Sequence, residues 1–249
     1  MDNLRPLGII SIAISIVAAT YIASSTWERV RVRPEMRKIE ITGSAKKRIV
    51  SDLIEWSATF EAQAKDRTEA YRKLHADATK VHEFLTSRGV VEKEVSLSAA
   101  NIDAIYETEY VGTGEDRIAR QNLQGYLARQ SVTVRSQDVA LIEKMSREIT
   151  DLLEQGITIS SSAPLDYYTK LGEVKIEMLA EASSDARVRA QNMVASAGGA
   201  ELGQLRSADM GVININPANQ TQGSWDGNND TTSLEKDIIT IVHAVYALE

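Results

Sequence analysis

Histidine is the side chain most often used for acid–base chemistry and metal binding near neutral pH, and this 249-residue chain contains three of them. His75 and His82 are seven positions apart in a segment with helical periodicity, which places them on nearly the same helix face but about 10 Å apart. One metal ion cannot contact both rings at that separation. His243 lies in a strongly apolar segment, where a core or interface position is expected. The histidines therefore predict neither a zinc site nor a catalytic base.

Oxygen-bearing side chains occur at alternate positions in Asp226–Asp230, as they do at the start of a calcium-binding loop. Such a loop requires glycine at its sixth position and glutamate at its twelfth, where this chain has Thr231 and Asp237. A solvated turn rich in asparagine and glycine accounts for the segment without a ligand. We therefore predict no calcium site and no other metal site.

The motifs for nucleophilic catalysis and phosphate binding are also incomplete. Ser160–Ser162 is a cluster of hydroxyl side chains, but no G-x-S-x-G or S-x-x-K motif accompanies it. Gly112 and Gly114 are not followed by the helix start and the Lys-Thr pair of a phosphate-binding loop. The absence of cysteine excludes thiolate catalysis, disulfides and Cys-ligated metals. We predict no catalytic, cofactor-binding or metal-binding residues and no enzymatic activity.

The composition is that of a folded protein without a nucleic-acid partner. Hydrophobic residues make up 43% and charged residues 25% of the chain, which excludes disorder throughout. The net charge is −7, and no run of Lys and Arg interleaved with aromatic residues is present, so nucleic-acid binding is not expected. Aromatic residues contribute only 5%, so Ile, Val, Leu and Ala must form most of the core.

The N-terminal segment has the properties of a membrane anchor. Leu7–Ser25 is a run of 19 residues without a charge, Asn, Gln or Pro. A helix of that length spans roughly 28 Å, close to the thickness of the hydrocarbon core. Tyr21 and Trp27 suit the headgroup layer at its end. We predict that residues 1–28 form a transmembrane anchor that contacts the lipid bilayer through residues 7–25. A secretory signal cleaved at the small residues Ala23–Ser25 is the alternative, although its apolar core would be unusually long.

A basic juxtamembrane linker is predicted over residues 29–36, with further basic residues immediately after it. The positive-inside rule alone would keep the body of the protein in the cytoplasm. Anionic lipid headgroups explain the same arginines on either leaflet. The charges therefore leave both orientations open.

The first half of the body alternates between strand and helix patterns. Residues 37–47 predict a short strand, and residues 50–64 predict a half-buried strand because apolar side chains occupy every second position. These apolar residues are Ile54, Trp56, Ala58, Phe60 and Ala62. A helix is predicted from about Asp66, where Asp66 and Glu69 resemble a capping box, to Gly89. Its apolar stripe is Ala70, Leu74, Ala78, Val81 and Leu85.

The second half predicts elements of the same kinds. Long strands over Val95–Val111 and Asn122–Arg135 are joined by a hairpin connection at Gly112–Asp116. The later elements are a helix from about Asp138 to Gly156, a strand over Ile157–Pro164, a helix over about Tyr168–Ala197, and strands over Met210–Ile215 and Ile238–Leu248. The apolar positions of these two helices are Leu141, Met145, Ile149, Leu152 and Leu153, and Leu171, Val174, Met178, Ala182, Ala186, Ala190, Met193 and Ala197. Between the last two strands, the polar residues 216–233 predict a mobile loop.

Together these elements predict an α+β fold, in which antiparallel or mixed sheets pack with three main helices. A strand, a helix and a terminating glycine recur three times, and no obvious linker separates the repeats. We therefore treat residues 37–249 as one domain outside the membrane.

Several of these segments resemble the SIMPL family (domain of unknown function 541). The family opens with an apolar strand, a Gly and then Pro-Asp before a second strand, and the corresponding residues here are Ile39–Ala45 and Ser51-Asp52, with Ser51 in place of Pro. Further matches in the same order are Gly125-Tyr126, Gly156-Ile157 and the Ala-rich helix that ends at Gly198. The resemblance covers roughly residues 37–248, and the loop over residues 216–233 matches no motif of the family.

The resemblance implies an envelope location, because family members are described mostly as bacterial envelope proteins, some of which assemble into rings or channel-like homo-oligomers. It supplies no catalytic residues. We expect a single-pass protein of the bacterial inner membrane with its body in the periplasm. A cytoplasmic body, which the basic flank favours, is the alternative.

The closing strand, residues 238–248, is apolar on both faces, and surplus apolar surface usually marks an interface. We therefore expect a homo-oligomer, most simply a ring, with a structural, scaffold or channel-like role. The alternative is a monomeric periplasmic ligand-binding module or an uncharacterised enzyme. The mass of the particle in mild detergent discriminates between the two.

Overall fold

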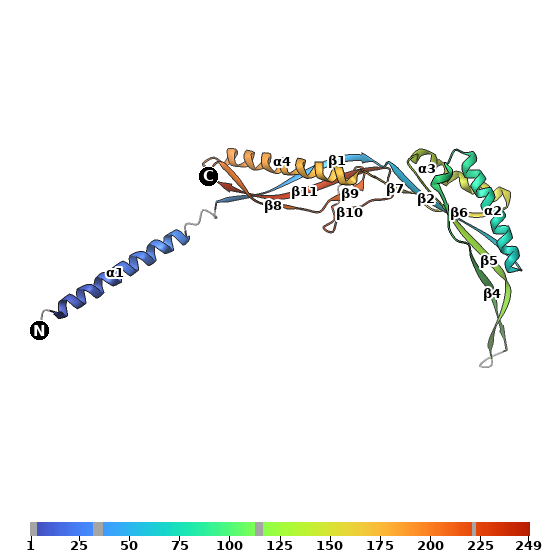
Figure 1. The fold of residues 1–249 in the computed structure, drawn as a ribbon, viewed down its shortest axis with the longest axis horizontal. Helices are drawn as coiled ribbons and strands as arrows, with labels where there is room; N and C mark the ends of the chain where they lie inside the picture. The colour runs from blue at the N-terminus through green and yellow to red at the C-terminus, as the bar shows by residue number, and fades with distance from the viewer. Residues whose placement is uncertain (1–3, 32–36, 113–116, 221–222) are drawn as a thin grey trace. The chain divides into compact units, whose positions relative to one another are not determined.

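The computed structural model describes residues 4–31, 37–112, 117–220 and 223–249, and in the N-terminal helix it describes the side chains of residues 13–27. The sequence predicts one domain over residues 37–249, whereas the chain packs into two compact units, each built from separate segments (Figure 1). Unit 1 comprises Met1–Ala45, Leu179–Gly211 and Ile241–Glu249. Unit 2 comprises Lys46–Met178 and Val212–Thr240.

The N-terminal helix α1 spans Leu4–Arg31. Its large apolar side chains are exposed wherever they are described, as for Ile14, Val17 and Ile22. Over the described part of the chain, no helix is long and apolar enough to cross a membrane. The predicted linker begins inside α1, and residues 32–36 lie outside the described residues.

Unit 2 contains a six-stranded antiparallel sheet in the order β3-β5-β2-β6, with β4 also paired to β5 and β7 also paired to β2. The strands are β2 (Leu53–Ala64), β3 (Val95–Leu97), β4 (Asn101–Val111), β5 (Ile118–Ser136), β6 (Thr158–Ser161) and β7 (Leu165–Tyr167). The predicted alternation of β2 is confirmed, because all five of its apolar residues are buried. The predicted hairpin is confirmed by the pairing of β4 with β5, whereas residues 113–116 of its connection lie outside the described residues.

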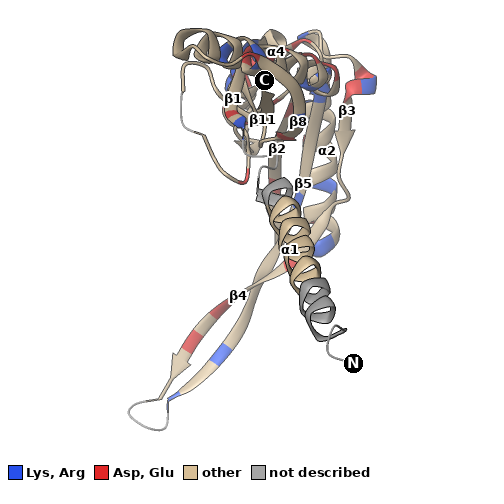
Figure 2. Ribbon diagram, turned by 90° about the vertical axis from the view of Figure 1, so that its left-hand side faces the viewer, with Lys and Arg blue, Asp and Glu red and all other residues tan. Residues whose placement is uncertain are grey.

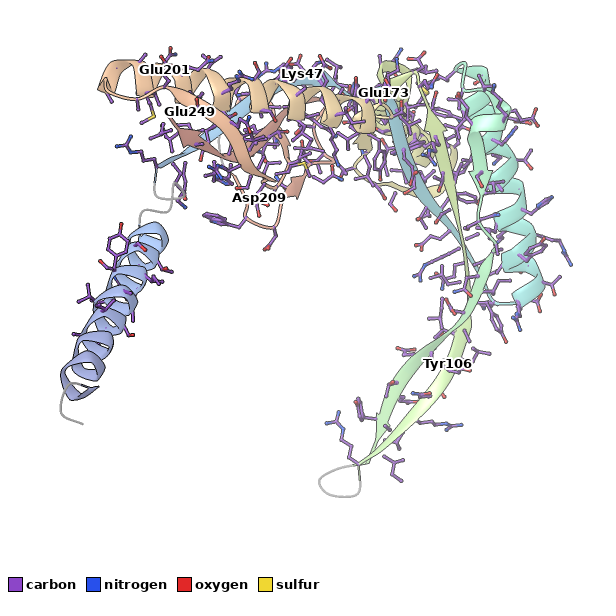
Figure 3. All side chains as sticks on the ribbon, turned by 60° about the vertical axis from the view of Figure 1, so that its left-hand side comes forward. Lys47, Tyr106, Glu173, Glu201, Asp209 and Glu249 are labelled. Carbon is purple, nitrogen blue, oxygen red and sulfur yellow. The ribbon has the colours of Figure 1, made fainter. Side chains whose placement is uncertain are left out.

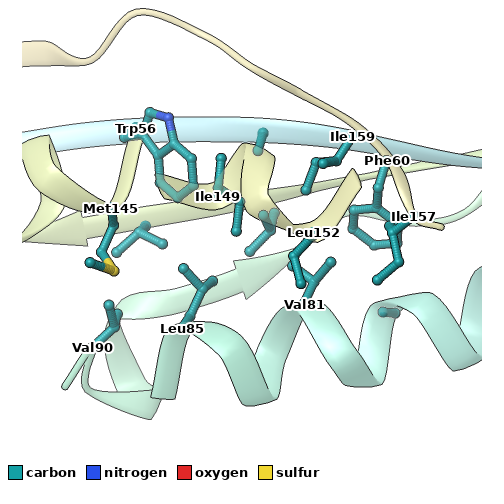
Figure 4. Packing of buried hydrophobic residues seen from close by; sticks show 14 of the residues in the cluster. Trp56, Phe60, Val81, Leu85, Val90, Met145, Ile149, Leu152, Ile157 and Ile159 are labelled. Carbon is teal, nitrogen blue, oxygen red and sulfur yellow. The ribbon is translucent and has the colours of Figure 1, made fainter. Parts of the chain in front are cut away.

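Helices α2 (Arg67–Ser87) and α3 (Val139–Glu148) pack with the 3-10 segment η4 (Ile149–Gln155) against this sheet (Figure 4). A shorter 3-10 turn, η2, spans Glu92–Glu94. Asp66 caps α2 by accepting hydrogen bonds from the backbone N–H groups of Thr68 and Glu69, and the five predicted stripe residues of α2 are all buried. Trp56 and Phe60 are the largest side chains of the resulting core.

A second sheet has the order β1-β11-β9-β10, with β8 also paired to β11. Its strands are β1 (Lys38–Val50), β8 (Leu202–Met210), β9 (Asn214–Pro217), β10 (Asn228–Asn229) and β11 (Glu235–Leu248). The predicted strand over residues 210–215 is therefore replaced by two strands, β8 and β9, on either side of Gly211. The backbone N–H of Gly211 instead donates a hydrogen bond to the carbonyl oxygen of Ile241 on β11.

Helix α4 (Leu171–Ala197) carries a stripe of small residues that lies against β1 in unit 1. Ala182, Ala186 and Ala190 are fully buried as predicted. The prediction was wrong at the end of the stripe, because Met193 and Ala197 are exposed and Val194 is buried in their place. The buried residues of α4 are spaced four apart without exception from Ala182 to Val194, so the stripe moves gradually around the helix.

The polar segment 216–233 has more secondary structure than its composition predicts. Strand β10 pairs in parallel with β9, and the side chain of Asn214 both donates to the carbonyl oxygen and accepts from the backbone N–H of Ser224. The Asn228 side chain donates to Asn216 Oδ1 at 2.7 Å. Residues 221–222 lie outside the described residues, and the mobility of the segment stays a prediction.

Candidate functional site

The residues that the sequence singles out for chemistry do not form a site. His75 is exposed on α2 and stacks on Tyr71, with ring centroids 6.2 Å apart. His243 was expected in the core or at an interface, but its side chain is exposed on β11, where Nδ1 lies 3.0 Å from the hydroxyl of Thr42. In the described ranges, no group of three or more His, Asp or Glu side chains is placed to hold a metal ion.

The serine cluster and the acidic loop have structural roles. Ser161 accepts a hydrogen bond from the indole N–H of Trp56 and donates one to the carbonyl oxygen of Ser146, so its hydroxyl joins β6 to β2 and α3. Asp230 accepts hydrogen bonds from the backbone N–H and the hydroxyl of Thr232, which closes a local turn. The Ser161 hydroxyl and Asp230 Oδ1 are thus engaged in structural hydrogen bonds.

A buried lysine in unit 2 forms the first candidate site. Lys236 on β11 is only 2% exposed, and its Nζ donates to the carbonyl oxygens of Asp166 and Asp230. Asp166 Oδ1 and Asp230 Oδ2 are buried without a hydrogen-bond partner among the described residues. A cavity of about 70 Å³ lies beside these groups, also lined by Tyr168 and Asn229. Its volume suits one or two water molecules, which would satisfy both carboxylate oxygens.

Burial dominates the electrostatics of this cluster. It raises the pKa of Asp166, and the neighbouring Lys236 opposes that change while Glu143 and Asp230 add to it. Burial also lowers the pKa of Lys236. For Asp230, hydrogen bonds from the Thr232 backbone and the Thr232 and Ser233 side chains outweigh burial and lower the pKa. The arrangement holds the buried lysine on two backbone carbonyl oxygens, and its cavity is too small for an organic substrate.

A second buried carboxylate belongs to Asp237, whose side chain is 1% exposed. It accepts from Arg48 Nε and Lys46 Nζ, each at 2.9 Å, and from the backbone N–H of Asn219 at 2.7 Å. The hydrogen bond from Arg48 and the other donors hold the pKa of Asp237 well below its ordinary value. Every carboxylate oxygen is thereby satisfied, so this cluster joins β1 to β11 and leaves no open ligand position.

The second candidate site is a surface on the two long strands of the hairpin. We call residues 105–111 of β4 and 118–125 of β5 the ribbon. They pair in antiparallel register from Ile105 with Gly125 to Val111 with Ile118, with a bulge after Ile105. Figures 1 and 3 show the ribbon continuing beyond the end of α2, with no other element of unit 2 beside it. Every described residue from Tyr106 to Gly112 is exposed.

The ribbon has one mainly apolar face and one mainly polar face. On the first, Tyr106 lies opposite Leu123 and Tyr110 lies opposite Ala119, and the Arg117 guanidinium stacks 4.2 Å from the Tyr110 ring centroid. Tyr106, Tyr110 and Leu123 are 50–58% exposed, and Figure 3 shows Tyr106 on the ribbon.

On the mainly polar face, Glu109 lies opposite Arg120 and Glu107 lies opposite Asn122, while the exposed apolar side chains of Val111 and Ile118 lie opposite each other at its end. The Asn122 side chain donates to Glu109, and the Gln124 side chain donates to Glu107 at 2.7 Å. This alternation of apolar and polar side chains is typical of a strand pair with one buried face, but no described element of unit 2 covers either face.

The two strands of the ribbon carry opposite charges, as Figure 2 shows. β4 contains Asp103, Glu107 and Glu109 and no basic residue, whereas Arg117 precedes β5 and Arg120 lies within it. Within the described ranges, none of these five side chains forms an ion pair, although Arg129 further along β5 pairs with Glu61. Sequence patterns identified the hairpin but could not show that its apolar side chains are left uncovered.

The chain is therefore an α+β protein with two clusters of buried charged residues, an exposed amphipathic ribbon and, among the described residues, no group of His, Asp or Glu placed to hold a metal ion. Residues 39–246 match the SIMPL family, described as a protein of unknown function (DUF541), and the chain belongs to this family. The resemblance seen in the sequence is thus confirmed over most of the chain. No curated protein matches the sequence.

Proposed function

We propose that this protein is a membrane-anchored, self-associating protein of the bacterial cell envelope with a structural, scaffold or channel-like role, and that it is not an enzyme. The single observation that carries the proposal is the ribbon, whose apolar face and polar face are both exposed. A two-stranded ribbon is only marginally stable in water, and a third strand or a covering surface is needed for it to persist. A second copy of the chain supplies such a surface without requiring a different partner protein.

The helix α1 supports anchoring in a membrane. The side chains of Ile14, Ile16, Val17 and Ile22 are 61–69% exposed, and because successive residues turn by about 100° they point to several sides of the helix. A helix that is apolar all round is matched to lipid rather than to water. The uncharged run in the sequence extends over residues 7–25, beyond the side chains of residues 13–27 that the structure describes, and it favours a single membrane span. The family resemblance favours a body in the periplasm.

The test of self-association is the mass of the full chain extracted in mild detergent, measured by light scattering at micromolar concentration. We expect a discrete oligomer. Combining Tyr106→Ser with Leu123→Ser removes two apolar side chains of the ribbon and is expected to shift the protein towards monomer. The matched control combines Tyr71→Ser with Leu153→Ser, whose side chains are 48% and 52% exposed on α2 and η4, against 55% and 50% for the ribbon pair.

A monomeric wild type would contradict self-association and would favour the alternative, a monomeric ligand-binding module. If the ribbon variant and its control lose the oligomer to the same extent, the ribbon is not the interface.

Membrane anchoring and the orientation of the body are tested by two separate measurements. An N-terminus that begins after Ala23–Ser25 in the mature protein would contradict the anchor. Protection of the body from protease in intact spheroplasts would place it in the cytoplasm.

A further inference from the structure

We propose that a basic hollow in unit 1 binds the phosphate of an anionic lipid headgroup, with the guanidinium groups of Arg37 and Arg206 as its ligands. The hollow has a volume of about 350 Å³ and is lined by Arg37, Lys38, Arg206 and Val245, all of which belong to unit 1. This inference rests on the membrane anchoring proposed above. It names a lipid contact that the body of the protein makes in addition to the contacts of α1.

The second sheet brings these residues together from distant parts of the sequence. The backbone N–H of Leu248 on β11 donates a hydrogen bond to the carbonyl oxygen of Arg37, which places the start of β1 beside the end of β11. Ala244 and Tyr246 of β11 pack in one cluster with α4. Because side chains alternate along a strand, Val245 between them points to the face of the sheet that α4 does not cover. The hollow is therefore open to a ligand from outside.

Arg206 reaches the hollow from an irregular position on β8. Where β8 pairs with β11, Ser207 lies opposite Val245, and Leu205 lies opposite the next residue of β11, Tyr246. Arg206 is thus the extra residue of a β-bulge. The extra residue of a bulge is left out of the regular pairing, and bulges often redirect a side chain at a functional site. The bulge accounts for the presence of Arg206 beside Arg37.

The guanidinium groups of the hollow are available to an anion. Within the described ranges, neither Arg37 nor Arg206 forms an ion pair or a side-chain hydrogen bond, and both side chains are exposed. Lys38 differs, since its Nζ pairs with Glu40 at 2.6 Å. Among the described residues, no acidic side chain lines the hollow. A guanidinium presents paired donors in one plane, which match the oxygens of a phosphate, so two of them without partners favour this ligand.

The length of chain between α1 and the hollow favours a lipid as the source of that phosphate. α1 ends at Arg31, and Arg37 follows six residues later. Even a fully extended chain covers at most about 22 Å over six residues. Because α1 is proposed to span the membrane, this short connection holds the hollow close to the headgroup layer. A tether of this kind gives lipid headgroups a high effective concentration at the hollow, which dissolved phosphate lacks.

The test uses the full chain in a neutral detergent, titrated with phosphatidylglycerol, with phosphatidylcholine and with inorganic phosphate. Native mass spectrometry counts the bound lipids, and amide hydrogen exchange reports on the bulge at residues 205–207. We expect phosphatidylglycerol to bind in preference to phosphatidylcholine and to slow exchange at the bulge. Arg206→Gln is expected to weaken the binding of phosphatidylglycerol about fivefold, and the combination with Arg37→Gln about thirtyfold, since each basic residue near an anionic surface contributes a factor of about five.

The matched control is Arg187→Gln, which removes the same charge from unit 1. Arg187 is also exposed and has no ion pair in the described part of the chain, but it lies on α4 and lines a different hollow. Arg187→Gln is expected to bind phosphatidylglycerol as the wild type does. If Arg206→Gln and the control weaken binding to the same extent, general electrostatic attraction accounts for it and the proposed site is wrong.

Two further results separate this inference from the proposals on which it rests. If inorganic phosphate slows exchange at the bulge as strongly as phosphatidylglycerol does at the same concentration, the hollow binds free phosphate and the lipid assignment is overturned. If high salt alone releases the chain from membranes, the proposed anchoring is wrong and this inference falls with it. An anchored chain whose preference for phosphatidylglycerol is unchanged by Arg206→Gln would overturn the headgroup site alone.

Discussion

Replacing Gly43 by alanine is expected to destabilise unit 1, because β1 meets α4 at this residue without room for a side chain. A Cβ atom at Gly43 would lie 2.1 Å from the carbonyl oxygen of Ala182 and 2.5 Å from the backbone nitrogen of Ala186. The third neighbour is the Ala186 Cβ at 2.7 Å. Two of these atoms are helix backbone and the third is fixed to it, so the contact is relieved only by moving β1 away from α4.

The size of that movement determines how much the free energy of unfolding decreases. Ordinary contacts of a Cβ atom lie at 3.4–4 Å, so the strand and the helix must separate by about 1 Å or more near Gly43. Overpacking of a close contact typically costs about 1–3 kcal/mol. The separation also loosens the packing of the fully buried Ala186 and Ala190 along the same stripe. We therefore expect a loss of at least about 2 kcal/mol in the free energy of unfolding of unit 1.

The assay is urea unfolding of the full chain, with amide hydrogen exchange to assign the change to β1 and α4. Gly172→Ala is the matched control, because Gly172 lies in the first turn of α4 and a Cβ there has no heavy atom within 4 Å. Alanine in a helix is favoured over glycine by up to about 1 kcal/mol, so the control is expected to be neutral or stabilising. A Gly43→Ala protein within about 0.5 kcal/mol of the wild type, with unchanged exchange in β1, would refute the reasoning.

Three further changes test unit 2. Trp56→Phe removes the hydrogen bond from the indole to Ser161 and is expected to cost about 1 kcal/mol in chemical unfolding. Lys236→Met leaves two carbonyl oxygens without their donor and Asp166 without its cation, so a loss of about 2 kcal/mol or more is expected, together with a higher pKa of Asp166 by NMR titration. Asp237→Asn probes a carboxylate whose pKa is depressed in the folded state. Its stabilisation is fully present above the ordinary value of 3.8 and is lost as the pH falls towards the folded pKa, so the stability difference from wild type is expected to shrink in unfolding curves below about pH 4. If the stability difference between Asp237→Asn and the wild type grows as the pH falls, the pKa of Asp237 is not depressed in the folded state.

The parts of the fold that were predictable depend on contacts within one short segment. The alternation from Ile54 to Ala62 and the stripe from Ala70 to Leu85 each repeat the period of their own element, so they are visible in the sequence. The cap at Asp66 likewise depends on N–H groups two and three residues away. The bounds of β8 were not predicted, because its exposed residues of mixed polarity carry no periodic signal and its pairing with β11 is long-range.

The ionic clusters could not be predicted for a related reason. Lys236 contacts Asp166 and Asp230, which come from β7 and from the segment before β11. No spacing rule connects residue 166 with residue 236, and each residue alone is an ordinary charged side chain in a polar context. Only the pairing of distant strands shows that the lysine is buried and that its partners are carbonyl oxygens.

The ribbon is the case in which the sequence pattern and the fold disagree most informatively. Residues 106–111 belong to a predicted long strand, and the strand is present, but its apolar side chains are exposed. The core of unit 2 takes its buried β5 residues from Ala128, Val132 and Val134, all beyond the ribbon. Folding of unit 2 therefore does not require Tyr106, Tyr110 or Leu123 to be apolar. Exposed apolar side chains on an open strand pair are typical of a surface that makes a further contact, which is the observation on which the proposed self-association rests.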